Sequence, residues 1–187
     1  MEVKDLELEG LKLISLNQIH DERGYFFESF NEKKFREMTG VDVNFVQDNV
    51  SLSSETVVRG LHYQVPPMAQ GKYVQVLKGK VIDVAVDIRP DSPTFLKSVS
   101  VRLWANEGKA FYIPPGFAHG FKVETREAVF MYKVTEYFSP EHERALNWAD
   151  PDLDIDWGGN RDKYLSLKDK QAPFLKEALE DIKKLSW

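Results

Sequence analysis

The sequence has no cysteine among its 187 residues. Disulfide bonds, thiolate-bound metals, iron–sulfur clusters and a thiol nucleophile are therefore excluded, and any catalytic group must be a histidine, carboxylate, lysine, tyrosine or serine. No apolar run approaches the roughly 18 residues of a membrane-spanning helix, and the N-terminus lacks the basic-then-apolar pattern of a signal peptide. We therefore expect a soluble, cytoplasmic protein that does not associate with a membrane.

An excess of positive charge is also missing. The chain holds 25 Lys or Arg against 30 Asp or Glu, a formal net charge of −5, which excludes a broadly basic nucleic-acid-binding surface. Residues 51–122 differ from the rest, because they hold nine Lys or Arg against five Asp or Glu. This central segment can hold one compact anion such as a diphosphate.

Apolar residues make up 42% of the chain and aromatic residues 12%, enough for a sizeable core, so we expect one domain over residues 1–187. We divide it into an N-terminal arm (about 1–30), a roll of strands (about 40–138) and C-terminal loops with a helix (139–187).

Short β-branched or aromatic runs, closed by Gly, Pro, Asn or Asp, follow one another between residues 11 and 138. No helices alternate with these strands, so the pattern favours an antiparallel sandwich or barrel over a parallel α/β sheet. Lys78-Gly79 predicts a hairpin turn. Beyond it, alternation places four aliphatic residues on one strand face and Asp83 and Asp87 on the other.

Two helices are predicted. Asn31 can cap a short helix through Met38 that stops near Gly40, and Pro173 opens a second helix. The apolar stripe of the second helix consists of Phe174, Leu175, Ala178, Leu179, Ile182 and Leu185. We interpret residues 139–170 as an ordered loop that carries site residues, because its three large aromatic side chains need burial.

Two of the four histidines stand out by their surroundings. The segment IPPGFAHGF, which contains His119, resembles the second motif of cupin jelly rolls, although the expected Asn after the histidine is absent. The first cupin motif would supply His-x-His and then Glu as metal ligands, and here those positions hold His62, Gln64 and Lys72. An ammonium repels a divalent cation and stabilises an anion or enolate. The sequence therefore predicts a site without a metal.

A histidine, a lysine and a tyrosine without a metal suit proton abstraction next to a carbonyl. His62 can act as the base, Lys72 can stabilise the enolate oxygen, and a hydroxyl such as that of Tyr132 can return a proton on the opposite face. For Tyr132 alone, a plain sheet tyrosine with its hydroxyl at the surface stays the alternative.

Several motifs occur in order and in register over about residues 10–175: DERGYFFESF, FVQDNVS, RGLHYQ, QGKYVQVLKGKVIDVAVDIR, IPPGFAHGF, MYKVTEYFSPEHE and WADPDLDIDW. Their order and spacing resemble the dTDP-4-dehydrorhamnose 3,5-epimerase family. The resemblance implies an all-β, cupin-type jelly roll with a few short peripheral helices, including a C-terminal one. It also implies a cofactor-independent homodimer that epimerises C3 and C5 of dTDP-4-dehydro-6-deoxyglucose on the way to dTDP-L-rhamnose.

The resemblance also assigns roles to single residues. It makes His62 the general base, Tyr132 the general acid and Asp169 the carboxylate that orients the histidine, with Lys72 at the enolate oxygen. The contacts it implies with the nucleotide sugar are Arg23, Glu28, Gln47, Asp48, Asn49, Arg59, Lys72, His119, Phe138, Glu143 and Lys168. In this family the N-terminal arm contributes to the partner's site, so Arg23 and Glu28 are expected to act across the dimer.

Two local features qualify these roles. Arg59 and His62 have opposite parity on one predicted strand, so both can face one ligand only if the strand bulges or bends, for which Gly60 is the natural place. Many family members have a second site tyrosine where this chain has Phe138. Ring stacking is expected to persist there while a hydroxyl contact is lost, which bears on the balance between epimerising one carbon and two.

Three alternatives stay open on the sequence. The first is an epimerase that acts at C5 or C3 alone, or on another dTDP-4-keto-6-deoxy sugar. The second is a metal-dependent cupin such as an oxygenase or isomerase. The third is a sugar-binding module without catalysis, which gives no reason for His62, Asp169, Lys72 and Tyr132 to occur together.

Overall fold

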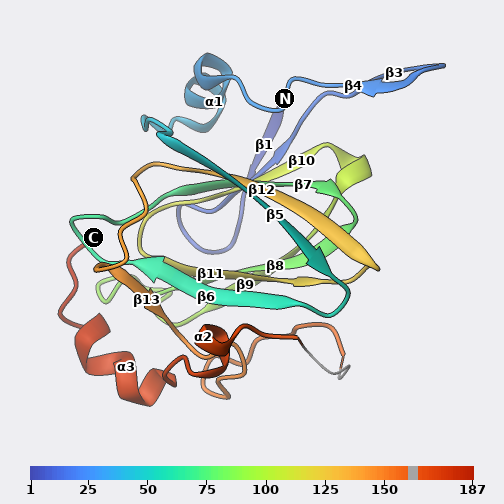
Figure 1. The fold of residues 1–187 in the computed structure, drawn as a ribbon. Coiled ribbons are helices and arrows are strands. Elements are labelled where there is room, and N and C mark those ends of the chain that lie inside the picture. The colour runs from blue at the N-terminus through green and yellow to red at the C-terminus, as the bar shows by residue number, and fades with distance from the viewer. Residues whose placement is uncertain (160–163) are drawn as a thin grey trace.

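The computed structural model describes residues 1–159 and 164–187, and two antiparallel β-sheets packed face to face form most of it (Figure 1). The first sheet contains, in spatial order, β1 (Glu2–Asp5), β2 (Lys12–Ser15), β10 (Lys109–Ile113), β7 (Lys72–Lys78), β12 (Glu127–Val134) and β5 (Gln47–Ser54). The second contains β13 (Glu143–Ala145), β6 (Val58–Gln64), β11 (Phe117–Val123), β8 (Lys80–Asp87) and β9 (Ser98–Trp104). The predicted antiparallel sandwich is confirmed.

The N-terminal region divides between the sandwich and a projection. Strands β1 and β2 belong to the first sheet, whereas β3 (Ile19–Asp21) and β4 (Gly24–Phe26) form a separate hairpin that extends away from the body of the molecule (Figure 1). Within the predicted N-terminal arm (about 1–30), the hairpin is the part that projects, whereas β1 and β2 are part of the sandwich.

The central strands β8 and β11 of the second sheet are buried on both faces. On β8, Ile82 and Val86 pack in a core under the C-terminal segment, whereas Val81 and Ala85 pack in the core between the sheets. The predicted alternation is therefore confirmed, and burial on both sides explains why this strand reads as an almost continuous apolar run. Asp83 shares the parity of Val81 and Ala85 and is fully buried.

The chain changes sheets at Gly79. Strand β7 ends at Lys78 in the first sheet and β8 begins at Lys80 in the second, so the predicted hairpin is wrong, because these two strands do not pair. Gly79 has a φ of 78°, and a Cβ there would lie 2.2 Å from the carbonyl oxygen of Glu127. The local sequence pattern correctly indicates a turn, but tertiary packing decides which sheet the following strand joins.

Both predicted helices are present. The side chain of Asn31 accepts a hydrogen bond from the Lys34 amide at the start of α1 (Glu32–Thr39), and Gly40 ends this helix with a φ of 71°. The C-terminal helix α3 (Leu175–Ile182) follows Pro173 and buries its first and last residues against the second sheet. Phe174 lies outside the buried stripe, because it is the N-cap and is 38% exposed.

The segment predicted as loop contains two short elements. Strand β13 extends the edge of the second sheet, and α2 (Leu167–Lys170) is a single helical turn. A 3₁₀ turn at Ala105–Glu107 links β9 to β10. Trp157 is buried as predicted, but Tyr164 is 72% exposed. No helix in the described part of the chain is long and apolar enough to cross a membrane.

Strand β6 is irregular at Gly60, as predicted from residue parity. His62 pairs with His119 of β11, and Arg59 pairs with Phe121, so three residue steps on β6 span two steps on β11. This bulge reverses the alternation between Arg59 and His62 and lets both side chains face the space between the sheets.

We expect Gly60→Ala to destabilise the protein by about 3 kcal/mol or more. Gly60 has a φ of 121°, and an added Cβ would lie 2.5 Å from the Gly120 Cα. Gly24→Ala is the matched control, because Gly24 has a φ of 126° but no atom within 4 Å of an added Cβ, so only backbone strain of about 1 kcal/mol is expected. Denaturant unfolding measures the loss of stability in both variants. Equal losses would show that the close contact with Gly120 does not add to the cost of the Gly60→Ala substitution.

Candidate active site

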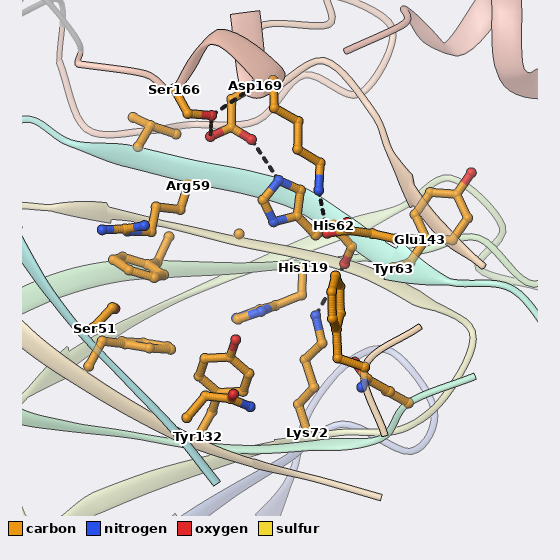
Figure 2. A pocket seen from close by; sticks show the side chains of 18 of the residues that line it. Ser51, Arg59, His62, Tyr63, Lys72, His119, Tyr132, Glu143, Ser166 and Asp169 are labelled. Atoms are coloured by element: carbon orange, nitrogen blue, oxygen red, sulfur yellow. Dashed lines mark hydrogen bonds and ion pairs between the residues drawn. The ribbon is translucent and has the colours of Figure 1, made fainter. Parts of the chain in front are cut away.

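A cavity of about 750 Å³ lies between the two sheets (Figure 2). Strands β5, β7 and β12 of the first sheet and strands β6 and β11 of the second contribute side chains to it. The predicted site residues that line it are Asp48, Asn49, Arg59, His62, Lys72, His119, Tyr132, Phe138, Glu143, Lys168 and Asp169. The fold therefore gathers most of the predicted site residues at one place.

His62 and Asp169 form a hydrogen-bonded pair although 107 positions separate them. The His62 Nε2 atom and the Asp169 Oδ1 atom lie 2.6 Å apart, and the carboxylate is buried. Burial alone would raise the pKa of Asp169, but hydrogen bonds from His62 and Ser166 outweigh it, so this pKa is lowered. An ionised carboxylate that accepts from Nε2 leaves the other ring nitrogen, Nδ1, to accept a proton from a ligand.

Ser166 holds the Asp169 carboxylate in place. Its Oγ donates to Asp169 Oδ2 over 2.7 Å and accepts from the Asp169 amide over 3.0 Å, so one hydroxyl both caps α2 and orients the carboxylate. Ser166 was not among the site residues predicted from the sequence. A serine three positions before an acidic residue is nevertheless a recognised signal for the start of a helix.

Lys72 is a buried cation at the cavity wall. Its Nζ atom donates to the carbonyl oxygen of His62 over 3.2 Å (Figure 2). Burial lowers the pKa of Lys72 to about 8, against the opposing effect of the negative charges of Asp83 and Glu143. A protonated lysine so placed can stabilise negative charge that develops on a bound ligand.

His119 pairs with a second buried carboxylate. Its Nε2 atom lies 2.9 and 3.1 Å from the two oxygens of Asp83. Burial lowers the pKa of His119, against the opposing charge of Asp83, and burial also raises the pKa of Asp83. Because Nε2 is engaged, Nδ1 is the nitrogen that His119 can offer to a ligand. The sequence singled out His119 but not its partner.

Tyr132 lies across the cavity from His62 (Figure 2). It belongs to β12 of the first sheet, whereas His62 belongs to β6 of the second. Its side chain lines the cavity, so the alternative of a hydroxyl on the outer surface is wrong. Burial raises the pKa of Tyr132, with the Arg59 charge opposing, so the phenol keeps its proton at neutral pH. A base and an acid on opposite walls can act on opposite faces of one bound intermediate.

Charged and aromatic groups complete the cavity. Glu143 and Lys168 form an ion pair, and Arg59 Nε donates to Ser53 Oγ over 3.0 Å. Phe138 lines the cavity with 53% of its surface exposed. The cavity thus offers cations for an anionic group and an aromatic face for a ring.

Three predicted contact residues do not line the cavity of this chain. Arg23 and Glu28 lie on or next to the projecting hairpin, and each forms an ion pair within this chain, Arg23 with Asp21 and Glu28 with Lys34 of α1. The Gln47 amide is held between Asn49 and the backbone of Phe138. Within one chain, Arg23 and Glu28 therefore lie away from the cavity, whereas Gln47 stands behind two residues that line it.

The side chains do not fit a bound divalent metal. Gln64, at the position of the second cupin histidine, uses its amide to donate to two backbone carbonyls and to accept from one backbone amide. Lys72 adds a positive charge. Within residues 1–159 and 164–187, no group of three or more His, Asp and Glu is arranged to hold a metal ion.

Comparison with known proteins places the chain among sugar-nucleotide epimerases. A family model described as dTDP-4-dehydrorhamnose 3,5-epimerase matches residues 5–177. A protein of that name from Pseudomonas aeruginosa is 50% identical over 158 residues, which cover 84% of this chain and 87% of the relative. The solved structure of dTDP-6-deoxy-D-glucose-3,5-epimerase from Legionella pneumophila, in complex with dTDP-4-keto-L-rhamnose, matches with a TM-score of 0.93 and 45% identity, and the match covers 97% of this chain and 96% of that one.

A further solved relative has a narrower activity by its name. ChmJ from Streptomyces bikiniensis, a 3′-monoepimerase in complex with dTDP-quinovose, matches with a TM-score of 0.90 and 33% identity, over 98% of this chain and 91% of that one. The family model and the relatives span most of this chain. The chain therefore belongs to the dTDP-4-dehydrorhamnose 3,5-epimerase family.

Proposed function

We propose that this protein epimerises C3 and C5 of dTDP-4-dehydro-6-deoxy-D-glucose to give dTDP-4-dehydro-L-rhamnose, in dTDP-L-rhamnose biosynthesis and without a metal or cofactor. One observation carries the proposal. The His62–Asp169 pair and Tyr132 stand on opposite walls of a single cavity, with the Lys72 ammonium between the sheets. Membership of the family supports the choice of substrate.

The mechanism is a proton exchange next to the C4 ketone. His62 Nδ1 takes the proton from the carbon beside the carbonyl, and the electron pair moves onto the C4 oxygen, where Lys72 stabilises the enolate. Tyr132 then gives its proton to the opposite face of the same carbon, so the configuration inverts. Solvent restores the proton of the tyrosine and removes that of the histidine, and nothing is oxidised or reduced.

The other side chains of the cavity suit the rest of the substrate. The Arg59 guanidinium can make charge-assisted hydrogen bonds to a diphosphate, and Lys168 adds a second cation. Phe138 offers a ring face for the thymine base. These contacts bind the substrate without taking part in proton transfer.

The decisive measurement is NMR of dTDP-4-dehydro-6-deoxyglucose incubated with the enzyme in D₂O. We expect deuterium at both C3 and C5, together with inversion at both carbons. In Tyr132→Phe we expect labelling to persist while inversion drops by about 10²-fold or more, because the base remains and the acid is lost. Exchange at neither carbon in the wild-type protein would end the enzyme proposal.

The same experiment tests the nearest alternative. ChmJ shows that a protein with this fold can be a 3′-monoepimerase. This cavity also lacks the hydroxyl of the tyrosine that many family members have at the position of Phe138. Labelling and inversion at C3 alone, or at C5 alone, would favour that narrower activity. Metal analysis of protein purified without added metal tests the metal-dependent alternative, and stoichiometric iron, manganese or zinc would contradict our mechanism.

We also propose that the protein is a homodimer whose projecting hairpin reaches the partner's cavity. On the hairpin, Ile19 and Phe26 are 60% and 71% exposed, and on the edge strand β5, Val50 and Leu52 are 64% and 63% exposed. Ile19 pairs with Phe26 across the hairpin, and Val50 and Leu52 share one exposed face of β5, so each pair forms a contiguous apolar patch of the kind that marks an interaction surface. A dimer that covers them would bring Arg23 to a cavity.

Complementation between two inactive variants tests this arrangement. If Arg23 acts across the dimer, a mixture of Arg23→Ala and His62→Ala chains forms mixed dimers in which one cavity has both natural residues. We expect the mixture to recover activity that neither variant has alone. Failure to recover activity despite mixed dimers, or a monomer by light scattering, would contradict the proposal.

A further inference from the structure

The turn that carries Phe138 is held by two glutamine side chains. Gln64 Nε2 donates to the carbonyl oxygen of Tyr137 over 3.1 Å, and Gln64 Oε1 accepts from the Ser139 amide over 2.7 Å. The Phe138 amide itself donates to Gln47 Oε1 over 3.1 Å. Three successive backbone positions are therefore tied to side chains from two different strands, β6 of the second sheet and β5 of the first.

Phe138 depends on these backbone ties for its position. Its ring lines the cavity but is 53% exposed, so packing against its own chain contributes little to holding it. Gln64, in contrast, is 3% exposed and donates a further hydrogen bond to the Met68 carbonyl over 2.6 Å. The buried Gln64 side chain thus fixes the backbone on both sides of the exposed Phe138.

We propose that Gln64 is a positioning residue: it fixes the Tyr137–Ser139 turn so that the Phe138 ring forms a preformed wall for the base of a thymidine nucleotide. The identity of this ligand rests on the function proposed above. Gln64 stands two residues after His62 on the same inward-facing side of β6. The position that would hold a metal ligand in a metal-binding cupin therefore shapes the ligand pocket here.

The chemistry of the amide explains why glutamine suits this position. Two donors and one acceptor are required at once, and the amide of glutamine supplies all three in one plane. A glutamate would turn its carboxylate toward the carbonyl oxygens of Met68 and Tyr137, and a histidine has only two ring nitrogens. Either change would release the turn.

Binding of dTDP, measured by calorimetry, tests the proposal without requiring turnover. We expect Gln64→Met and Gln64→Glu to raise the Kd of dTDP by about five- to tenfold, since loss of a base–aromatic contact has an effect of this size. KM should rise by a similar factor, while kcat stays within about twofold, because the proton-transfer groups are untouched. Gln64→Glu keeps the acceptor for Ser139 and serves alone if Gln64→Met does not fold.

Asn147 provides the matched control. It is also a buried amide that bridges backbone segments, since it donates to the Ala172 carbonyl and accepts from the Ala149 amide, and it does not line the cavity. Asn147→Leu and Asn147→Asp should therefore lower stability with little change in the Kd of dTDP. Equal effects on dTDP binding in the Gln64 and Asn147 variants would reduce Gln64 to a general structural role.

A double-mutant cycle with Phe138→Ala separates positioning from an independent contact. If Gln64 acts through the ring, Phe138→Ala should weaken dTDP binding in the wild-type protein but add little in the Gln64 variant. Fully multiplicative effects, or an unchanged Kd in both Gln64 variants, would overturn the proposal. If the wild-type protein binds dTDP but exchanges no deuterium into the sugar, the proposed function fails while this test of Gln64 stays valid.

Discussion

Replacing His62 with alanine is expected to lower kcat by about 10³-fold, because a positioned general base contributes about 10²- to 10⁴-fold. Deuterium incorporation at C3 and C5 should fall with it, since the same nitrogen is proposed to remove both protons. KM should change little, because the groups suited to the diphosphate and the base lie elsewhere in the cavity. NMR in D₂O and steady-state kinetics measure the two effects.

The Asp169→Asn substitution should lower kcat almost as much as the loss of the base itself. The asparagine keeps the size of the side chain but replaces the charge that accepts from His62 Nε2 over 2.6 Å, so the imidazolium formed during proton abstraction loses its stabilising partner. We expect kcat to fall by about 10²-fold or more. Asp150→Asn is the matched control, because Asp150 is also buried but accepts from backbone amides away from the cavity.

The results can contradict this assignment in two ways. A His62→Ala enzyme with near-normal turnover would revive the sugar-binding module and remove the histidine from the mechanism. Labelling that persists at one carbon only would show that a second base serves that carbon.

Replacing Lys72 with methionine should lower kcat by about 10²- to 10³-fold, the usual effect of removing a group that stabilises an oxyanion. Methionine keeps much of the volume of the buried side chain, so packing changes little. The loss should appear in kcat more than in KM, because the negative charge on the C4 oxygen develops only during the reaction.

The pH dependence follows from the same residue. Burial lowers the pKa of Lys72 to about 8, so the side chain is a cation below about pH 8 and becomes neutral above it. Only the cation stabilises the enolate, and kcat/KM should therefore fall as the pH rises through about 8. Tyr132 does not account for this fall, because burial raises its pKa above the ordinary value for tyrosine.

Two variants test whether Lys72 causes the fall in kcat/KM at alkaline pH. Lys72→Arg keeps its charge to high pH, so the fall near pH 8 should disappear even if the absolute rate is lower. Lys78→Met changes an exposed lysine at the far end of the same strand and should leave the profile unchanged. An alkaline limb that persists unaltered in Lys72→Arg would assign it to another group.

Local features of this protein could be predicted because they depend on near neighbours in the chain. Asn31 and Gly40 mark the ends of α1, since capping and a positive φ are properties of single residues and their immediate surroundings. The alternation on β8 and the bulge at Gly60 follow from the two-residue period of a strand. Motif order further identified the family, which the comparisons confirm.

Errors arose where distant segments decide the outcome. Lys78-Gly79 is a turn, but the choice between a hairpin and a change of sheet depends on how the eleven strands of the two large sheets, as described for residues 1–159 and 164–187, divide between the two layers. The sequence pattern does not indicate the helical turn α2, because four residues give almost no periodic signal. What anchors this turn is a distant contact, the hydrogen bond between the Asp169 carboxylate and His62. Tyr164 was predicted to be buried from its type alone, and it lies exposed at the cavity.

The sequence by itself determined the strand-rich class, the absence of thiol chemistry, and the histidine, lysine and tyrosine available for proton transfer. Only the tertiary structure decided that Asp83 underlies His119, that Gln64 holds the Phe138 turn, and that Arg23 lies outside its own chain's cavity. The reason is physical. Backbone propensity and alternation act over a few residues, whereas the partners of a buried polar group are set by which strands and loops pack together.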